Sequence, residues 1–189
     1  MQLDLPTIIS LLRETIVAPR SAARRVLSIA GGFNLALLAV AFVAVLSAGT
    51  SVLLSKFTPP TGKPEIDYLM SQPLQLAGMQ ALGMLIFGAA VTGIGRLFGG
   101  KGRFDQTLML LAWLDFLLLV LQLGLIVLML ALPPLAGLVS LVAMALIVWL
   151  LASFIAELHG FASTTSTLAV IIATVLFLGV VLVLISPLI

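Results

Sequence analysis

Residues 104–132 read FDQTLMLLAWLDFLLLVLQLGLIVLMLAL, and after Asp105 this stretch is almost entirely apolar. A soluble helix of this length would show a polar face. At about 1.5 Å rise per residue the stretch forms a helix roughly 40 Å long, which exceeds the hydrocarbon core of a bilayer. It therefore predicts a transmembrane helix with two polar residues in its interior, Asp115 and Gln122.

The whole chain has the composition of a membrane protein. Charged residues make up 8% of it and hydrophobic residues 62%, whereas a soluble domain carries about 25% charged residues. Nine Lys and Arg against seven Asp and Glu is too small an excess to indicate a nucleic-acid-binding surface. The absence of Cys excludes disulfides, thiolate catalysis and Cys-ligated zinc or iron–sulfur clusters. We expect an all-α polytopic membrane protein without a cofactor.

Apolar runs separated by turn residues predict a bundle of five transmembrane helices. Their approximate bounds are 27–55, 74–98, 106–132, 135–156 and 165–185. Pro133 and Pro134 predict a tight turn, so the third and fourth spans should form an antiparallel hairpin. The organisation is then a cytoplasmic segment, 1–26, followed by a five-span domain, 27–189.

The segment before the first span is too short and too polar to cross a membrane. Its apolar residues share one helical face: Leu5, Ile8, Ile9, Leu12 and Ile16. Residues 1–18 therefore predict an amphipathic helix that either lies in the membrane interface or packs on the spans. Four arginines in this segment are expected to face anionic lipid: Arg13, Arg20, Arg24 and Arg25.

Positive charges are unevenly distributed between the predicted loops. With the N-terminus in the cytoplasm, cytoplasmic segments hold seven Lys and Arg, and the other side holds only Lys56 and Lys63. This asymmetry predicts a cytoplasmic N-terminus and an external C-terminus. Within the second span, small residues share a face suited to close helix packing in a membrane: Ala77, Ala81, Gly88, Thr92 and Gly95.

Asp115 is the residue that a functional argument must explain. It lies about ten residues into its span, where an ionised carboxylate is costly. Gln122, seven residues on, lies on nearly the same face. Asp115 is either part of a proton or ion relay or a hydrogen-bonded fastener between helices. We favour the fastener, because a relay normally needs several ionisable groups.

The predicted topology brings further polar residues to the cytoplasmic half, where a polar cluster with Asp115 and Gln122 is expected. These residues are Asn34, Arg96, Glu157 and His159, with Arg96 placed to reach Glu157. One His and no Cys argue against a catalytic metal site, which typically uses three protein ligands. A Ser-His-Asp arrangement cannot be argued either. We assign no catalytic, cofactor-binding or metal-binding residue and expect no enzyme.

Four blocks of the sequence carry a resemblance to a known family: PRSAARRVL, GGKGRFDQTLMLLAWLDFLLLVLQ, LPPLAGL and WLLASFIAELHGFAS. Together they resemble the bacterial branch of the Yip-domain family of Ypt/Rab-interacting membrane proteins. The resemblance implies five spans with the N-terminus in the cytoplasm, here of a bacterial inner membrane. Eukaryotic members assist vesicle formation through Rab-type GTPases and membrane shaping, but their tyrosine-glycine motifs are absent here. The resemblance brings no catalytic motif.

Three functions stay open. The first is a non-enzymatic membrane protein that organises, shapes or scaffolds the membrane or a complex in it, with anionic lipid and a membrane protein or a second copy as partners. The second is a small transporter or channel subunit that uses Asp115 and Gln122. The third and weakest is a lipid-acting membrane enzyme that uses Glu157 and His159.

Overall fold

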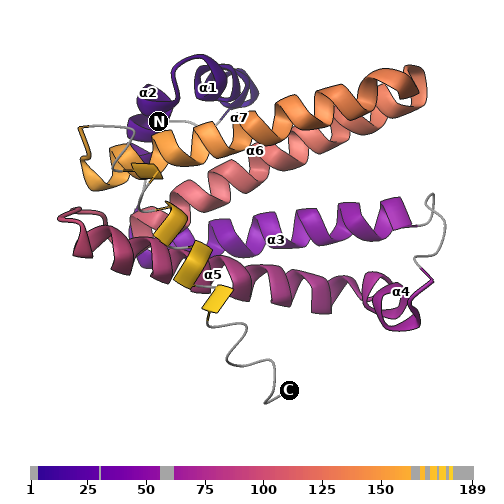
Figure 1. Ribbon diagram of the computed structural model, residues 1–189, viewed down its shortest axis with the longest axis horizontal. Helices are drawn as coiled ribbons and strands as arrows, with labels where there is room; N and C mark the ends of the chain where they lie inside the picture. Colours follow the sequence, from indigo (N-terminus) through magenta and orange to yellow (C-terminus); the bar gives the residue numbers. More distant parts are fainter. Residues whose placement is uncertain are drawn as a thin grey trace.

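The computed structural model describes residues 4–29, 31–55 and 62–162, and within the C-terminal part residues 167–168, 171–173, 175–177 and 179–180. Every regular element in these ranges is an α-helix (Figure 1). The helices are α1 (Leu5–Val17), α2 (Pro19–Ile29), α3 (Phe33–Ser55), α4 (Pro64–Met70), α5 (Pro73–Leu97), α6 (Phe104–Ala131) and α7 (Pro133–His159).

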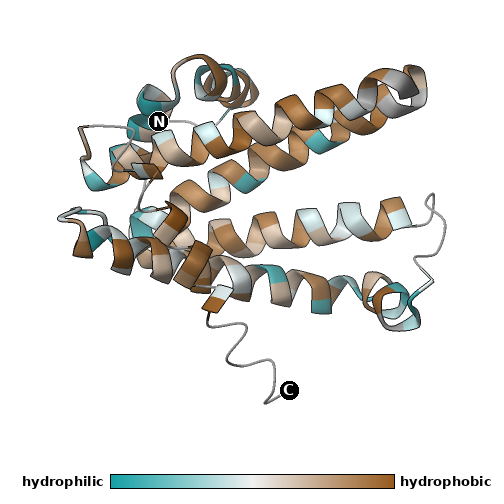
Figure 2. Ribbon diagram, viewed as in Figure 1, coloured by the Kyte–Doolittle hydropathy of each residue, from teal (hydrophilic) through white to brown (hydrophobic). Residues whose placement is uncertain are grey.

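Four of these helices are long and apolar enough to cross a membrane: α3, α5, α6 and the Gly137–His159 part of α7. Figure 2 shows hydrophobic residues along all of them, with polar residues mostly in α1, α2, α4 and the loops. The predicted fifth span, 165–185, lies largely outside the described residues. Its described pieces are helical, Thr167 is buried, and Ile171 packs against the hydrophobic core. The fifth span therefore stays a prediction.

The first span begins later than the sequence predicted. We expected it to start at residue 27, but α2 ends at Ile29 and α3 starts at Phe33. Gly32 directly precedes α3 and adopts φ +95°, a left-handed conformation that favours glycine and interrupts the helical path between α2 and α3. Because Gly31 and Gly32 are uncharged, they read as part of the apolar run, and residues 27–29 in fact belong to α2.

The α6–α7 hairpin confirms the turn predicted from the proline pair. Helix α6 ends at Ala131, Leu132 links the two helices, and α7 begins with Pro133. Proline suits the first helical turn because its missing N–H would have no intrahelical partner there. The segment between α3 and α5 was predicted as a loop and contains the short helix α4, which also starts at a proline.

Helix α6 is the centre of the bundle, since it packs against α2, α3, α5 and α7. Helices α3 and α5 pack against each other, whereas α5 and α7 contact each other at only a few positions. In Figure 1 the α6–α7 hairpin diverges from the α3–α5 pair toward the end that carries α4. The two pairs of helices therefore lie closer together near α2 than near α4.

Helix α1 forms where the amphipathic pattern predicted it, and it packs on the spans. Leu11 and Thr15 are buried, and Trp113 on α6 donates a 3.0 Å hydrogen bond from Nε1 to Oγ1 of Thr15. The opposite face leaves Leu5 and Ile9 exposed. Of the two placements that the sequence left open, packing on the spans is the one that these contacts favour.

Candidate intramembrane polar site

Asp115 joins three membrane-spanning helices. It lies eleven residues after Phe104, at a depth of about 16 Å along α6. Its Oδ2 atom accepts a hydrogen bond from Nε2 of Gln80 on α5 at 2.7 Å and one from Oγ of Ser47 on α3 at 3.3 Å. One carboxylate oxygen therefore connects α3, α5 and α6.

The second carboxylate oxygen of Asp115 is open. Among the described residues Oδ1 accepts no hydrogen bond, and no Lys or Arg there forms an ion pair with this carboxylate. Asp115 is also only half-buried. The surroundings of this carboxyl group are therefore two neutral donors and the space beside it.

That space is a cavity of about 660 Å³ between α3, α5, α6 and α7. Apolar side chains of α6 and α7 form most of its wall. The polar residues that line it are Ser47, Ser51, Gln80, Asp115, Gln122 and Ser140. A second cavity of about 370 Å³, between α5, α6 and α7, shares Gln80 and Asp115 with the first. Polar side chains of four helices thus line one cavity, and two of them, Ser47 and Gln80, bind Asp115 directly.

The cavity extends from Asp115 toward the α4 end of the bundle. Ser51 lies in the last part of α3, Ser140 in the first part of α7, and both helix ends are at the α4 end in Figure 1. In the opposite direction Leu110, Leu114 and Phe154 are buried in the core. The cavity lined by these residues holds only about 10 Å³, at the lower limit for one water molecule. Between this packed layer and Asp115 lies the smaller cavity of about 370 Å³, so space adjoins Asp115 on both sides and the larger part of it lies toward α4.

The structure separates the polar residues that the sequence placed in one cluster. Gln122 lines the same cavity as Asp115. Asn34 is exposed in the first turn of α3, about 20 Å along the helix from Ser47, so it does not bind Asp115. The partners of Asp115 are Ser47 and Gln80, which the sequence analysis did not single out. Gln80 is the one polar side chain between Gln75 and Thr92 in the second span, and this isolation is the signal that could have pointed to it.

Glu157 pairs with Arg24 of α2 at 3.2 Å, and the expected Arg96–Glu157 contact is wrong. Arg96 donates instead from Nε to the carbonyl of Gly102 at 3.2 Å. The reason is that α2 packs against α7, which brings Arg24 to Glu157. Arg24 thus connects α2 to α7 rather than only facing the membrane surface.

Arg25 is also engaged within the protein. It donates to Oε2 of Glu14 at 2.9 Å, and Ser21 donates to Oε1 of the same carboxylate at 2.5 Å. The hydrogen bond from Ser21, followed by that from Arg25, holds the pKa of Glu14 below its ordinary value of 4.5. Of the four arginines expected at the lipid surface, Arg13 is exposed and Arg20 is half-buried.

His159 fastens the end of α7 to the loop between α5 and α6. Its side chain is 2% exposed, and its Nδ1 atom accepts a 3.3 Å hydrogen bond from the Gly102 amide. The Lys101 amide donates to the His159 carbonyl at 3.3 Å. A Cβ atom at Gly95, Gly100 or Gly102 would overlap the imidazole ring. The buried histidine ring therefore requires glycine at all three positions, one on α5 and two in the loop.

The small-residue face of α5 lies mainly against α6. Ala77, Gly88, Thr92 and Gly95 are buried and Ala81 is half-buried. A Cβ atom at Gly88 would meet side chains of α6, whereas one at Gly95 would meet His159. Thr92 and Thr107 on α6 form a 2.7 Å hydrogen bond between their hydroxyl groups. Gly95 thus makes room for a side chain of α7, the imidazole of His159. Helical periodicity within α5 alone could not predict this contact.

The described residues contain no group of three His, Cys, Asp or Glu side chains that could hold a metal ion. A family model, the Yip1 domain, matches residues 13–185 of the chain. No curated protein and no solved structure matches it.

Proposed function

The chain belongs to the Yip1 domain family, and from this premise we propose that it organises, shapes or scaffolds the membrane, or a complex within it, without catalysing a reaction. Apolar membrane-spanning helices and family membership support a membrane-associated, non-enzymatic role.

The observation that carries the scaffold function is the use of polar side chains as links between helices. Asp115 connects α3, α5 and α6. The Arg24–Glu157 pair connects α2 to α7. His159 connects α7 to the α5–α6 loop. A bundle fastened in this way keeps a fixed shape, which is what a protein that holds lipids or partners in place requires.

The orientation in the membrane and the lipid partner follow from the distribution of charge. The seven-to-two distribution of Lys and Arg supports five spans with a cytoplasmic N-terminus and an external C-terminus. The bacterial inner membrane is the compartment we propose. Exposed arginines such as Arg13 would attract anionic lipid. A membrane protein or a second copy of the chain would be the partner.

A small transporter or channel subunit is the second candidate, and one observation favours it: the open oxygen of Asp115 beside a cavity of about 660 Å³. The closed layer around Phe154 argues against a continuous path. The lipid-acting enzyme has less support, because Glu157 is held in an ion pair and His159 is buried under the glycine loop.

Reconstitution into vesicles that contain anionic lipid tests the proposal. A scaffold should change vesicle size or curvature, seen by electron microscopy, and should leave proton and cation flux at the level of protein-free vesicles. Flux that depends on the protein and disappears in Asp115→Asn would establish the transport function instead. Unchanged vesicles without flux, and no association with a second copy or a purified membrane partner, would contradict the scaffold function.

A further inference from the structure

The cavity beside Asp115 has the features of a ligand site. Its volume of about 660 Å³ lies within the usual range for pockets that hold small molecules. Its wall is mostly apolar, with residues such as Leu118, Leu121 and Ile147, and a few polar groups converge within it. This combination of an apolar wall with few polar groups is typical of sites that bind amphiphilic molecules.

Asp115 determines the charge that such a ligand would carry. The carboxylate receives hydrogen bonds from two neutral donors, Gln80 and Ser47, both on Oδ2. Within the described part it has no cationic partner, and Oδ1 accepts no hydrogen bond. An ionised carboxylate at this depth is costly unless it is paired. A cationic group with an N–H donor is therefore the partner that complements this site.

The other polar groups favour a primary ammonium over other cations. A primary ammonium has three N–H donors and no acceptor, as the lysine side chain does. One donor would meet Oδ1 of Asp115, and the others would meet oxygen atoms of the residues beside it in the cavity, Ser47 and Gln80. A quaternary ammonium has no N–H group, and a metal ion would leave the long apolar wall without a contact.

We propose that this cavity binds an amphiphile with a primary ammonium group, which contacts Asp115 while its hydrocarbon chain lies along the apolar residues of α6 and α7. Both an aminophospholipid and a free long-chain amine have this chemistry. The ligand enters through the larger cavity, which extends toward α4, because the smaller cavity on the other side of Asp115 ends at the packed layer around Phe154. This site goes beyond the scaffold function and does not depend on it.

Dodecylamine is a suitable probe for the full-length protein in phosphatidylcholine nanodiscs. We expect saturable binding, measured by native mass spectrometry and by a rise in the thermal unfolding midpoint. Dodecyltrimethylammonium, which lacks N–H donors, and dodecanol, which lacks the charge, should bind at least about tenfold more weakly, since a charge-assisted hydrogen bond is worth roughly that factor. Equal binding of the three probes would overturn the proposal.

Nanodiscs that also contain phosphatidylethanolamine distinguish the two sources of the ammonium group. If the aminophospholipid occupies the cavity, the apparent affinity for dodecylamine falls in these discs. If the affinity stays the same, the site prefers the free amine. Both results leave the ammonium site in place and identify its natural class of ligand.

Asp115→Asn retains an oxygen acceptor and removes the charge. We expect amine binding to weaken at least about tenfold while dodecanol binding stays unchanged. Gln75→Leu, an exposed polar position on the same helix as Gln80 but outside the cavity, is the matched control and should bind as the native protein does. Ala143→Phe, which fills the cavity from α7 without removing a polar group, covers the case in which Asp115→Asn does not fold. Full amine binding in the Asn variant, or in the Phe variant if the Asn variant does not fold, would refute the site.

Discussion

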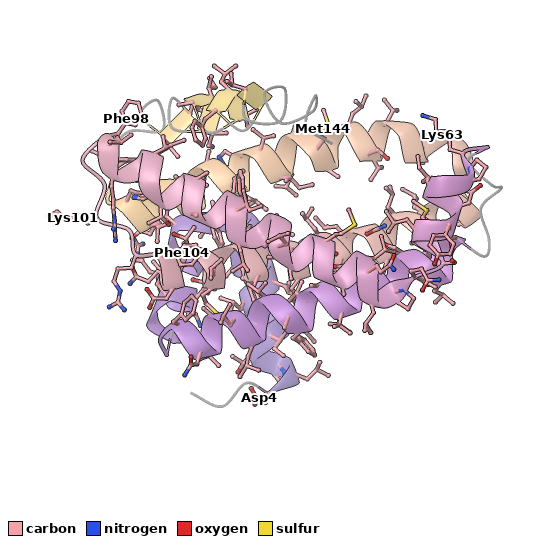
Figure 3. All side chains as sticks on the ribbon, turned by 90° about the horizontal axis from the view of Figure 1, so that it is seen from below. Asp4, Lys63, Phe98, Lys101, Phe104 and Met144 are labelled. Carbon is pink, nitrogen blue, oxygen red and sulfur yellow. The ribbon has the colours of Figure 1, made fainter. Side chains whose placement is uncertain are left out.

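The two ends of the helix bundle differ in what their polar side chains do. Figure 3 labels Phe98 and Lys101 at one end and Lys63 at the other. Near Lys101 the imidazole of His159 is buried between helices, and the cavity behind it is about 10 Å³. Toward Lys63, polar side chains line a cavity of about 660 Å³. Similar residue types thus pack one end and leave space at the other.

This difference follows from the residues that face each polar group. Glycines at positions 95, 100 and 102 let the loop approach the His159 ring, so the ring fills the space that they leave. Around Asp115 the cavity wall is formed by Leu118 of α6 and by Ala143 and Ile147 of α7, and α7 contacts α5 at only a few positions. Around His159 the glycines let the helices and the loop approach closely, whereas around Asp115 hydrogen bonds link α3, α5 and α6 and leave space toward α7.

The largest expected effect comes from adding a methyl group beside the His159 ring, at the packed end of the bundle. Gly95→Ala places a methyl group on the His159 ring, and overpacking of this kind costs roughly 1–3 kcal/mol. Gly93→Ala, two residues away on α5, meets nothing within 4 Å and is the matched control. Unfolding in detergent, followed by circular dichroism, compares the two. Equal stability of both variants would show that the space around the His159 ring accommodates an added methyl group.

At the open end the removal of a polar link should cost less. Asp115→Leu deprives Ser47 and Gln80 of their acceptor, and we expect a loss of about 0.5–2 kcal/mol. Asp115→Asn keeps an acceptor and should remain close to the native stability. The same unfolding measurement applies. A Leu variant as stable as the Asn variant would mean that Asp115 does not fasten the helices.

The ion pair between α2 and α7 should contribute less again. The Arg24 side chain is 62% exposed, so its pairing with Glu157 is screened by water. A double-mutant cycle with Arg24→Gln and Glu157→Gln should give a coupling energy of about 0.2–1 kcal/mol. The same cycle with Arg96→Gln in place of Arg24→Gln should give none. Coupling between Arg96 and Glu157 would restore the contact that the sequence suggested.

The sequence predicted the helices well because long apolar runs and prolines act locally. The α6–α7 turn follows from Pro133 directly, and α5 starts within one residue of its predicted position. The break at Gly32 was missed because hydropathy does not register a left-handed backbone. The short helix α4 was missed because the prolines and polar residues in and around it are typical of a loop.

The candidate site was less predictable because it depends on contacts between helices. Asp115 could be identified from its cost in a membrane, but its depth did not select Ser47 and Gln80 as partners. The position of Arg24 against Glu157 depends on how α2 turns back onto α7. The fit of His159 to three glycines joins residues more than fifty positions apart. Periodicity within one helix contains none of this information.

The smallest expected effect concerns α1, and it depends on pH. Ser21 and Arg25 hold the pKa of Glu14 below 4.5 in the folded protein. A lowered carboxyl pKa stabilises the folded state above the unfolded pKa, and this contribution is lost as the pH falls through the folded pKa. Docking of α1 should therefore weaken below about pH 4.5, the ordinary value for this group.

Trp113 reports this docking because it donates to Thr15 on α1. In a Trp149→Phe background its fluorescence should change as the pH falls from neutral to below the pKa of Glu14. Glu14→Gln removes the titrating group, so its fluorescence should be the same across this range and should already resemble that of the weakened state. Arg13→Gln, an exposed position one residue away, is the matched control and should retain the transition. A transition that persists in Glu14→Gln would mean that another group controls the docking of α1, and the Ser21–Glu14–Arg25 contacts would then be incidental to it.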